Sequence, residues 1–400
     1  MNLRQEEIVS AAEKLREKTA RTLIDLIRIP SPSRGEGDVI RYIEQRMRDL
    51  RFDEVRVDPM GNLLGRLGEG ERSIAFDAHA DVVDVVDGDS WTWPPFEGHN
   101  DGRFIYGRGA CDQKGAIASL LTAAELMKEL SLAGGVTVYV IITVQEEECE
   151  GLCWCHLIAE EGLRPDAVLL TEPSALKISR GQKGKLQMIV ETPGVGSHGS
   201  APELGENAIY KMARIVLGIE ELNGRLKAIP PVGKGTVAVS KIESRAASLC
   251  SVAEGCRIYL DRRLGHGETR EKAIHEIEQI AGPQGGKVRV PRYEGVSYRG
   301  LARAREEYYP GWLISEKSAL LGAALRTHRL LFKREGEVII WDFSTNGIAT
   351  CGLHGIPTIG FGPGDPRNAH VRDERVPLDH LVAASAFYAA FPSQYVSGGG

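Results

Sequence analysis

The chain has 400 residues, of which 42% are hydrophobic and 26% are charged. Its 49 lysines and arginines stand against 55 acidic residues, which gives a net charge of -6 at pH 7. Because no long basic run appears, the composition argues against nucleic acid as a partner. The sequence also contains no run of about 18 apolar residues, so we expect no membrane-spanning helix. The length allows two or three domains at roughly 100 to 200 residues each.

The N-terminal segment and the cysteines predict a cytoplasmic protein. Residues 1–7 lack the apolar core of a signal peptide. Seven cysteines are an odd number, which favours reduced thiols over a disulfide framework. The cluster of Cys149, Cys153, Cys155 and His156 allows a structural zinc site, but no second cysteine pair follows it. Buried free thiols are the default interpretation.

The first 81 residues have the pattern of an α/β layer. Apolar residues recur at helical spacing over 5–28 and 39–50, on either side of a proline-rich turn. Short apolar runs at 54–57, 62–67 and 74–81 predict strands. In sheets of this class, ligands bind beyond the carboxyl ends of the strands.

The run over 74–81 ends in His79-Ala80-Asp81. Alternate residues of a strand point the same way, so His79 and Asp81 can face one site. A neutral imidazole binds divalent metals, and a neighbouring carboxylate fixes its tautomer. Because a lone His-x-Asp arises easily by chance, the metal hypothesis depends on the residues that follow.

Further carboxylates come after a glycine turn and after two later strand-like runs. Asp112 follows Gly107-Arg108-Gly109 and precedes an apolar helix, so it is either a helix cap or a ligand. Glu146 and Glu147 end a β-branched run, where a surface charge cluster is the ordinary alternative. Glu172 ends another apolar run. Several strands that each end in a metal-competent residue favour a shared site.

The pattern changes after residue 181. Strands are predicted at 185–191, 236–242, 257–263 and 287–290, and helices at 207–222 and 268–280. This order is typical of an α+β sandwich with its helices on one face of a sheet. We therefore predict an inserted domain over 181–295 and a discontinuous metal-binding domain over 1–180 and 296–400. The last part resumes the α/β pattern, with His370 in a glycine-rich loop after a strand.

Six motifs, in this order, resemble those of the M20 family of co-catalytic zinc amidohydrolases. They are His79-Ala80-Asp81, Gly107 to Asp112, Glu146-Glu147, Glu172-Pro173, Ser197 to Pro202 and Gly362 to His370. That family includes acetylornithine deacetylase, succinyl-diaminopimelate desuccinylase, glutamate-releasing carboxypeptidases and dipeptidases. Within the family, the chain most resembles the branch of selenium-metabolism-linked hydrolases, on the runs Ser344 to Gly347 and Gln145 to Glu147.

The resemblance implies an α/β fold, in which a mixed-sheet zinc-hydrolase domain carries an inserted, ferredoxin-like α+β lid. The lid would form a homodimer. Two divalent ions are implied, with Zn²⁺ preferred and Co²⁺ or Mn²⁺ as alternatives. His79 and Glu172 would hold one ion, Glu147 and His370 the other, and Asp112 would bridge both.

The resemblance also implies a reaction, the hydrolysis of an amide or peptide bond in a small N-acyl amino acid or dipeptide-like substrate. Glu146 would be the general base acting on a hydroxide shared by the metals, and Asp81 would orient His79. A metal-binding scaffold without activity, a single-metal or cysteine-dependent hydrolase using Cys111, and a dipeptidase rather than a deacylase are the alternatives.

Substrate contacts are expected from His198, Asn207 and Arg263 of the lid. His198 would reach the other subunit's site, unless it only caps a turn. Arg263 matches an arginine near the substrate carboxylate, with a surface arginine on a sheet edge as the alternative. The runs Cys250 to Ala253 and Ser344 to Asn346 depart from the common family pattern, which predicts altered substrate contacts.

Overall fold

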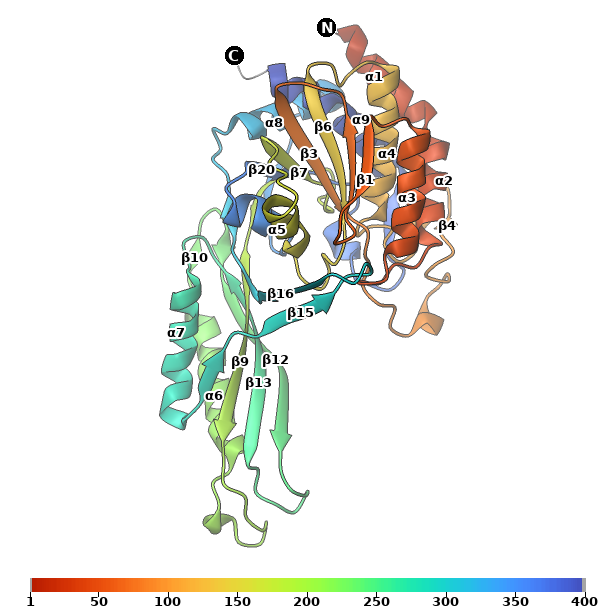
Figure 1. The fold of residues 1–400 in the computed structure, drawn as a ribbon. Helices are drawn as coiled ribbons and strands as arrows, with labels where there is room; N and C mark the ends of the chain where they lie inside the picture. The colour runs from red at the N-terminus through yellow and green to blue at the C-terminus, as the bar shows by residue number, and fades with distance from the viewer. Residues whose placement is uncertain (1, 398–400) are drawn as a thin grey trace.

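The structure, a computed structural model, describes residues 2–397 and consists of two bodies (Figure 1). Each body has its own hydrophobic core. The larger body draws its core from residues between Ile8 and Ile178 and between Tyr293 and Tyr395, and the smaller body from Leu186 to Ala281. The domain boundaries at 181 and 295 stay a prediction. Among the described residues, no helix has both the length and the apolar character needed to cross a bilayer.

A nine-stranded mixed sheet forms the centre of the larger body, in the order β1-β2-β6-β3-β7-β20-β8-β18, with β19 paired to β8. The strands are β1 Glu54–Val57, β2 Leu63–Leu67, β3 Arg72–His79, β6 Val136–Thr143, β7 Ala167–Leu170, β8 Ile178–Gln182, β18 Trp312–Leu313, β19 Val338–Trp341 and β20 Thr358–Gly360. β3 is parallel to both of its neighbours, β6 and β7. Its residues from Ile74 to His79 are all buried, which is typical of a central strand of an α/β sheet.

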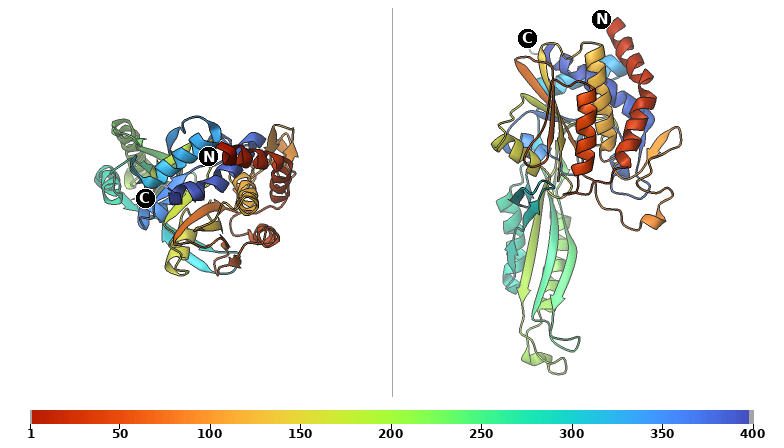
Figure 2. Two further views of the ribbon diagram at one scale, coloured as in Figure 1. Left: turned by 90° about the horizontal axis from the view of Figure 1, so that it is seen from above. Right: turned by 45° about the vertical axis from the view of Figure 1, so that its right-hand side comes forward.

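Helices cover both faces of this sheet (Figure 2). They are α1 Asn2–Lys14, α2 Arg16–Ile27, α3 Gly37–Asp49, α4 Lys114–Glu129, α5 Leu152–Ala159, α8 Ala319–Phe332 and α9 Leu378–Ser397. The rings of Phe76 on β3 and Tyr388 on α9 are 5.6 Å apart. The next residue, Asp77, points the opposite way and accepts a hydrogen bond from Trp154 of α5. The helix predicted over 5–28 is divided in two at Leu15.

The smaller body is an antiparallel sheet in the order β12-β13-β9-β14, with β17 paired to β9. Its elements are β9 Gly184–Pro193, α6 Ala208–Arg225, β12 Thr236–Arg245, β13 Gly255–Leu264, α7 Arg270–Ala281, β14 Lys287–Arg289 and β17 Tyr308–Tyr309. Even-numbered residues of β13 are buried, and those that are apolar pack in one core with residues of α6 and α7. The predicted fold, a mixed α/β domain with an inserted α+β lid, is confirmed.

A two-stranded ribbon, which the sequence did not predict, runs from the lid to the larger body (Figure 1). It consists of β15 Arg292–Val296 and β16 Ala302–Glu306. At its far end, the Tyr298 hydroxyl donates to the carbonyl of Gly61 at 3.1 Å. The remaining strands are β4 His99–Asn100, β5 Phe104–Tyr106 and β21 Arg375–Pro377 in a small sheet, and the hairpin β10 Ala228–Ile229 with β11 Gly233–Lys234.

Gly360 of β20 offers a test of packing behind the strand that leads to Glu172. A Cβ added there would lie 1.8 Å from the Trp341 ring. That ring is 2% exposed and donates to the Pro173 carbonyl at 3.2 Å. We expect Gly360→Ala to lower the free energy of unfolding by about 1–3 kcal/mol, measured by denaturant titration of metal-free protein. Gly134→Ala is the control, because its added Cβ meets no atom within 4 Å. Equal midpoints for the two variants would contradict this account.

Candidate active site

Five side chains that can bind metal converge beyond the carboxyl ends of the central strands. They form two groups whose ligand atoms lie within 4.8 Å of one another, one of His79, Asp112 and Glu172 and the other of Asp112, Glu147 and His370. His79 is the last residue of β3, and Glu172 follows β7 by two residues. Asp112 belongs to both groups, so it joins them into one cluster.

The carboxylate of Asp112 lies between two imidazoles. Its Oδ1 is 2.9 Å from His79 Nε2, and its Oδ2 is 3.3 Å from His370 Nε2. His370 Nε2 is also 3.0 Å from Glu147 Oε2, and His79 Nε2 is 3.9 Å from Glu172 Oε1. The helix-cap alternative for Asp112 is excluded, because Gln113 occupies the N-cap of α4 and no side chain caps that helix.

Asp81 is fully buried and holds the loop that carries the two glutamates. Its Oδ1 accepts the Glu146 N–H at 3.2 Å, and its Oδ2 accepts the Glu147 N–H at 3.0 Å and the Ser33 hydroxyl at 2.6 Å. His79 Nδ1 lies 2.9 Å from the backbone carbonyl of Asp81 and 3.6 Å from its carboxylate. The carbonyl of Asp81 is thus the nearer acceptor for the Nδ1 proton, which leaves Nε2 to face Asp112. That the Asp81 carboxylate orients His79 stays a prediction.

Glu374 supports Asp112 from behind and was missed in the sequence. Its fully buried carboxylate accepts the backbone N–H groups of Cys111 at 2.8 Å and Asp112 at 2.9 Å. Arg108 Nη1 forms an ion pair with Glu374 Oε2 at 2.7 Å, which balances the charge of the carboxylate. The one signal in the sequence was an acidic residue four positions after His370, within the same loop region.

Asn346 belongs to the run Ser344 to Asn346, whose effect on substrate contacts stays a prediction. The residue is fully buried behind the cluster. Its Nδ2 donates to Asp77 at 3.1 Å, and its Oδ1 accepts the Gly151 N–H at 2.8 Å. Because its polar atoms are used inside the core, Asn346 supports β3 and the start of α5.

Burial and crowding set the pKa values of the cluster. Burial and the charge of Asp112 together raise the pKa of Glu147 to about 7. Burial also raises the pKa values of Glu146 and Glu172 well above their usual range. Burial opposes ionisation of Asp112 too, but hydrogen bonds from His370 and His79 hold its pKa below the usual value. Glu172 Oε1 and Glu146 Oε1 are buried without hydrogen-bond partners, so the residues present fit bound cations.

The three expected substrate contacts lie in the lid and are not joined to the cluster by any hydrogen bond or ion pair among residues 2–397. His198 is exposed in the loop after β9, and its Nδ1 is 2.7 Å from the Ser200 hydroxyl. This loop lies at the end of the lid away from the larger body (Figure 1). Asn207 caps α6 by accepting the Ile209 N–H at 2.9 Å. Arg263 pairs with Asp261 at 2.8 Å, near the C-terminal end of β13.

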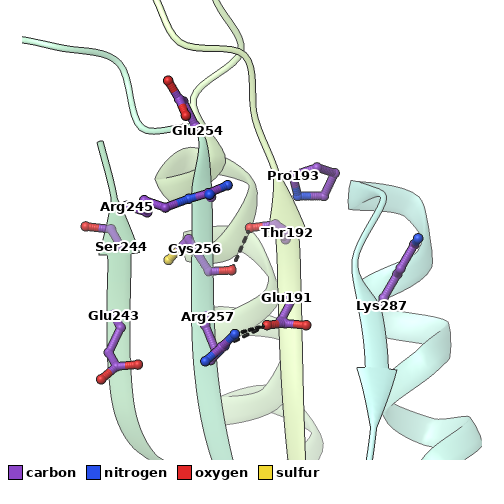
Figure 3. A pocket seen from close by; sticks show the side chains of 11 residues that line it. Glu191, Thr192, Pro193, Glu243, Ser244, Arg245, Glu254, Cys256, Arg257 and Lys287 are labelled. Atoms are coloured by element: carbon purple, nitrogen blue, oxygen red, sulfur yellow. Dashed lines mark hydrogen bonds and ion pairs between the residues drawn. The ribbon is translucent and has the colours of Figure 1, made fainter. Parts of the chain in front are cut away.

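A hollow of about 920 Å³ lies at the outer end of the lid sheet (Figure 3). Its lining is charged, and Arg257 Nε donates to Glu191 Oε1 at 2.6 Å inside it. None of the metal-competent residues of the larger body lines it. This hollow is therefore separate from the chemistry of the cluster.

The cysteines do not form a second centre within residues 2–397. The group Cys149, Cys153, Cys155 and His156 contacts four different partners, namely Tyr309, Asn346, Arg305 and Asp58. All seven cysteines are free. Burial raises the pKa of the Cys111 thiol well above its usual value, and its Sγ donates to the Asp365 carbonyl at 3.3 Å. Because the thiolate is the nucleophile, this environment disfavours cysteine catalysis.

Comparisons with known proteins show the family of this chain. A family model of peptidase family M20/M25/M40 matches residues 75–394. The protein YgeY of Escherichia coli (strain K12) is 40% identical over 392 residues, covering 98% of this chain and 97% of that protein. A succinyl-diaminopimelate desuccinylase of Dinoroseobacter shibae is 28% identical and covers 93% of this chain and 97% of that enzyme. Assignment to the selenium-linked branch stays a prediction.

A solved structure from Bacillus subtilis shares the fold. It is YXEP, described as a dinuclear metal-binding peptidase of the M20 family, and it has a TM-score of 0.68 at 15% identity. The similarity covers 96% of this chain and 99% of that one. The chain belongs to peptidase family M20/M25/M40 and is a metal-dependent hydrolase of amide or peptide bonds, as the order of its motifs predicted.

Proposed function

We propose that the protein removes the acyl group from a small N-acyl amino acid, with two divalent metal ions and Glu146 as general base. The observation that carries this proposal is the pair of ligand groups that share Asp112. Three protein donors per ion is the number found in catalytic zinc sites. The desuccinylase name of the Dinoroseobacter relative supports deacylation over dipeptide cleavage.

The metal ions would be held by mixed imidazole and carboxylate donors. His79 and Glu172 would bind one ion and Glu147 and His370 the other, while the two oxygens of Asp112 would serve both. This donor set suits Zn²⁺, with Co²⁺ and Mn²⁺ as alternatives. Such ions polarise the scissile carbonyl and lower the pKa of water.

Glu146 is placed to move the proton. Its side chain is 5% exposed, and one of its oxygens has no hydrogen-bond partner. Burial raises the pKa of Glu146 well above the usual value. A general base works best when its pKa lies near the working pH, so this shift toward neutral pH suits the role. Glu146 would accept a proton from the attacking water and deliver it to the leaving nitrogen. A scaffold without activity would have lost this residue or a ligand, and the chain retains all of them.

The lid has the features of a dimer interface. β12 is an edge strand without a partner on its outer side among the described residues. Tyr210 and Leu217 of α6 and Ile242 of β12 are 67%, 60% and 56% exposed. An unpaired edge beside exposed apolar side chains favours pairing with a second copy. We propose a homodimer through the lid, in which His198 donates to the substrate oxyanion in the partner's site.

Metal content tests the two-ion arrangement. We expect about two divalent ions per chain in fully loaded protein, and loss of activity when they are removed with a chelator. Elemental analysis of the variant that combines Glu147→Ala with His370→Ala should give about one ion, since only one ligand group remains complete. A native content of one ion that survives both substitutions would contradict the proposal.

The role of Glu146 is tested by Glu146→Gln. The amide keeps the shape of the side chain but cannot accept the proton, so turnover should fall by about 10²- to 10⁴-fold while metal content stays unchanged. Glu129→Gln, an exposed carboxylate at the end of α4, is the matched control. Steady-state kinetics with a panel of N-acyl amino acids gives the answer. Turnover at the native rate would exclude Glu146 as the base.

Subunit mixing tests the action of His198 across the dimer. Loss of one oxyanion donor typically costs about 2.7 to 4 kcal/mol of barrier, so His198→Ala chains should be nearly inactive. Chains with Glu146→Gln should be inactive because they lack the general base. Heterodimers of the two variants should regain one working site, because one site combines an intact cluster with an intact partner histidine. Mixed, re-associated dimers as inactive as their parents would contradict action across subunits.

A further inference from the structure

The loop between β6 and α5 presents Glu146 and Glu147 from an unusual backbone conformation. Gln145, immediately before the pair, has a φ of 58°. Residues other than glycine rarely adopt this left-handed region, and they stay there only when their surroundings hold them. The position of both glutamates therefore depends on contacts made to the residues beside them.

Apart from the ribbon, the contacts from the larger body reach backbone N–H groups of Gln145, Glu146 and Glu147. The Glu36 carboxylate accepts the N–H of Gln145 at 3.0 Å and that of Arg34 at 3.0 Å. Asp81 accepts the next two amides. The amide side chain of Gln145, which is 1% exposed, is bound from the opposite side.

The ribbon makes this contact with the Gln145 side chain through a single hydroxyl group. Tyr293 Oη accepts from Gln145 Nε2 at 2.8 Å and donates to Glu148 Oε2 at 2.6 Å. It thus binds the residue before the Glu146–Glu147 pair and the residue after it. Glu148 is held in turn by Arg34, whose Nε lies 3.1 Å from Glu148 Oε1.

The ribbon is tied to the lid at the end near Tyr293. The backbone of Glu307 bonds to Pro291 and to Gln187 of β9, both at 3.0 Å. Arg270 of α7 pairs with Glu306 at 3.1 Å. The loop between β6 and α5 also makes two contacts with strands of the lid. Lys185 of β9 pairs with Glu150, and Tyr309 of β17 donates to Cys149 Sγ at 3.7 Å.

We propose that Tyr293 is a positioning residue for the reaction. Its hydroxyl fixes the loop over 145–148 from the ribbon, and so holds the base Glu146 and the ligand Glu147 in place. The inference rests on the proposed roles of those two glutamates. Without the hydroxyl, the Gln145 side chain is left buried without a partner and the left-handed backbone loses one of its constraints.

The test compares two tyrosines of one ribbon. Tyr293→Phe removes the hydroxyl that binds the loop. Tyr298→Phe removes the hydroxyl that binds the Gly61 carbonyl, which is no part of the cluster. For Tyr293→Phe we expect kcat to fall by about 10- to 100-fold with little change in KM, because the base is misplaced while the substrate still binds. Tyr298→Phe should keep kcat within about twofold of the native value.

A second measurement does not depend on turnover. Titration of metal-free protein with Co²⁺, followed by its absorption, should show about tenfold weaker binding of one ion in Tyr293→Phe and native binding in Tyr298→Phe. The combined variant with Gln145→Ala should be no worse in kcat than Tyr293→Phe alone, since both changes act through one contact.

Three results would overturn the proposal. They are equal effects of the two tyrosine substitutions, native kcat and Co²⁺ binding in Tyr293→Phe, and additive losses when Gln145→Ala is combined with it. If the native protein hydrolyses none of the N-acyl amino acids, the proposed function fails instead, and the Co²⁺ titration still decides the role of Tyr293.

Discussion

One carboxylate between two imidazoles is the constraint on which the rest of the larger body depends. Asp112 contacts His79 and His370 with its two oxygens, and these residues come from distant parts of the chain. Holding such charges out of water is costly unless each has polar partners. The fold therefore also places, beside the cluster, buried carboxylates that bind the backbone N–H groups of the cluster residues. Glu374 receives the amides around Asp112, and Asp81 receives those of the glutamate pair.

The parts that were predictable from the sequence follow from strand geometry. A parallel strand delivers the residue at its carboxyl end to the same edge as its neighbours, whatever the side chains around it. His79 and Glu172 could therefore be placed together from two apolar runs and the residues that end them. The lid was predictable for a different reason, because the order of its predicted strands and helices over 181–295 is typical of an α+β sandwich.

The supporting contacts were not predictable, because they join residues far apart in sequence. Glu374 lies 262 positions from Asp112, and Tyr293 lies 148 positions from Gln145. No local pattern distinguishes such a glutamate or tyrosine from one on the surface. The buried bond between Asn346 and Asp77 was not predictable for the same reason, since it spans 269 positions. The ribbon was missed because both of its faces carry charged residues, which hides the alternation that marks a strand.

The geometry of the lid separates two of the expected substrate contacts. Arg263 is opposite Lys185 at the start of β9, whereas His198 lies beyond Pro193 at its end. A strand of ten residues spans about 33 Å at roughly 3.3 Å per residue. The two side chains are therefore too far apart to meet at one metal pair within a single chain. If both contact the same substrate, Arg263 must come from the chain that owns the cluster and His198 from a second copy, so an active site with both residues requires an assembly of at least two chains.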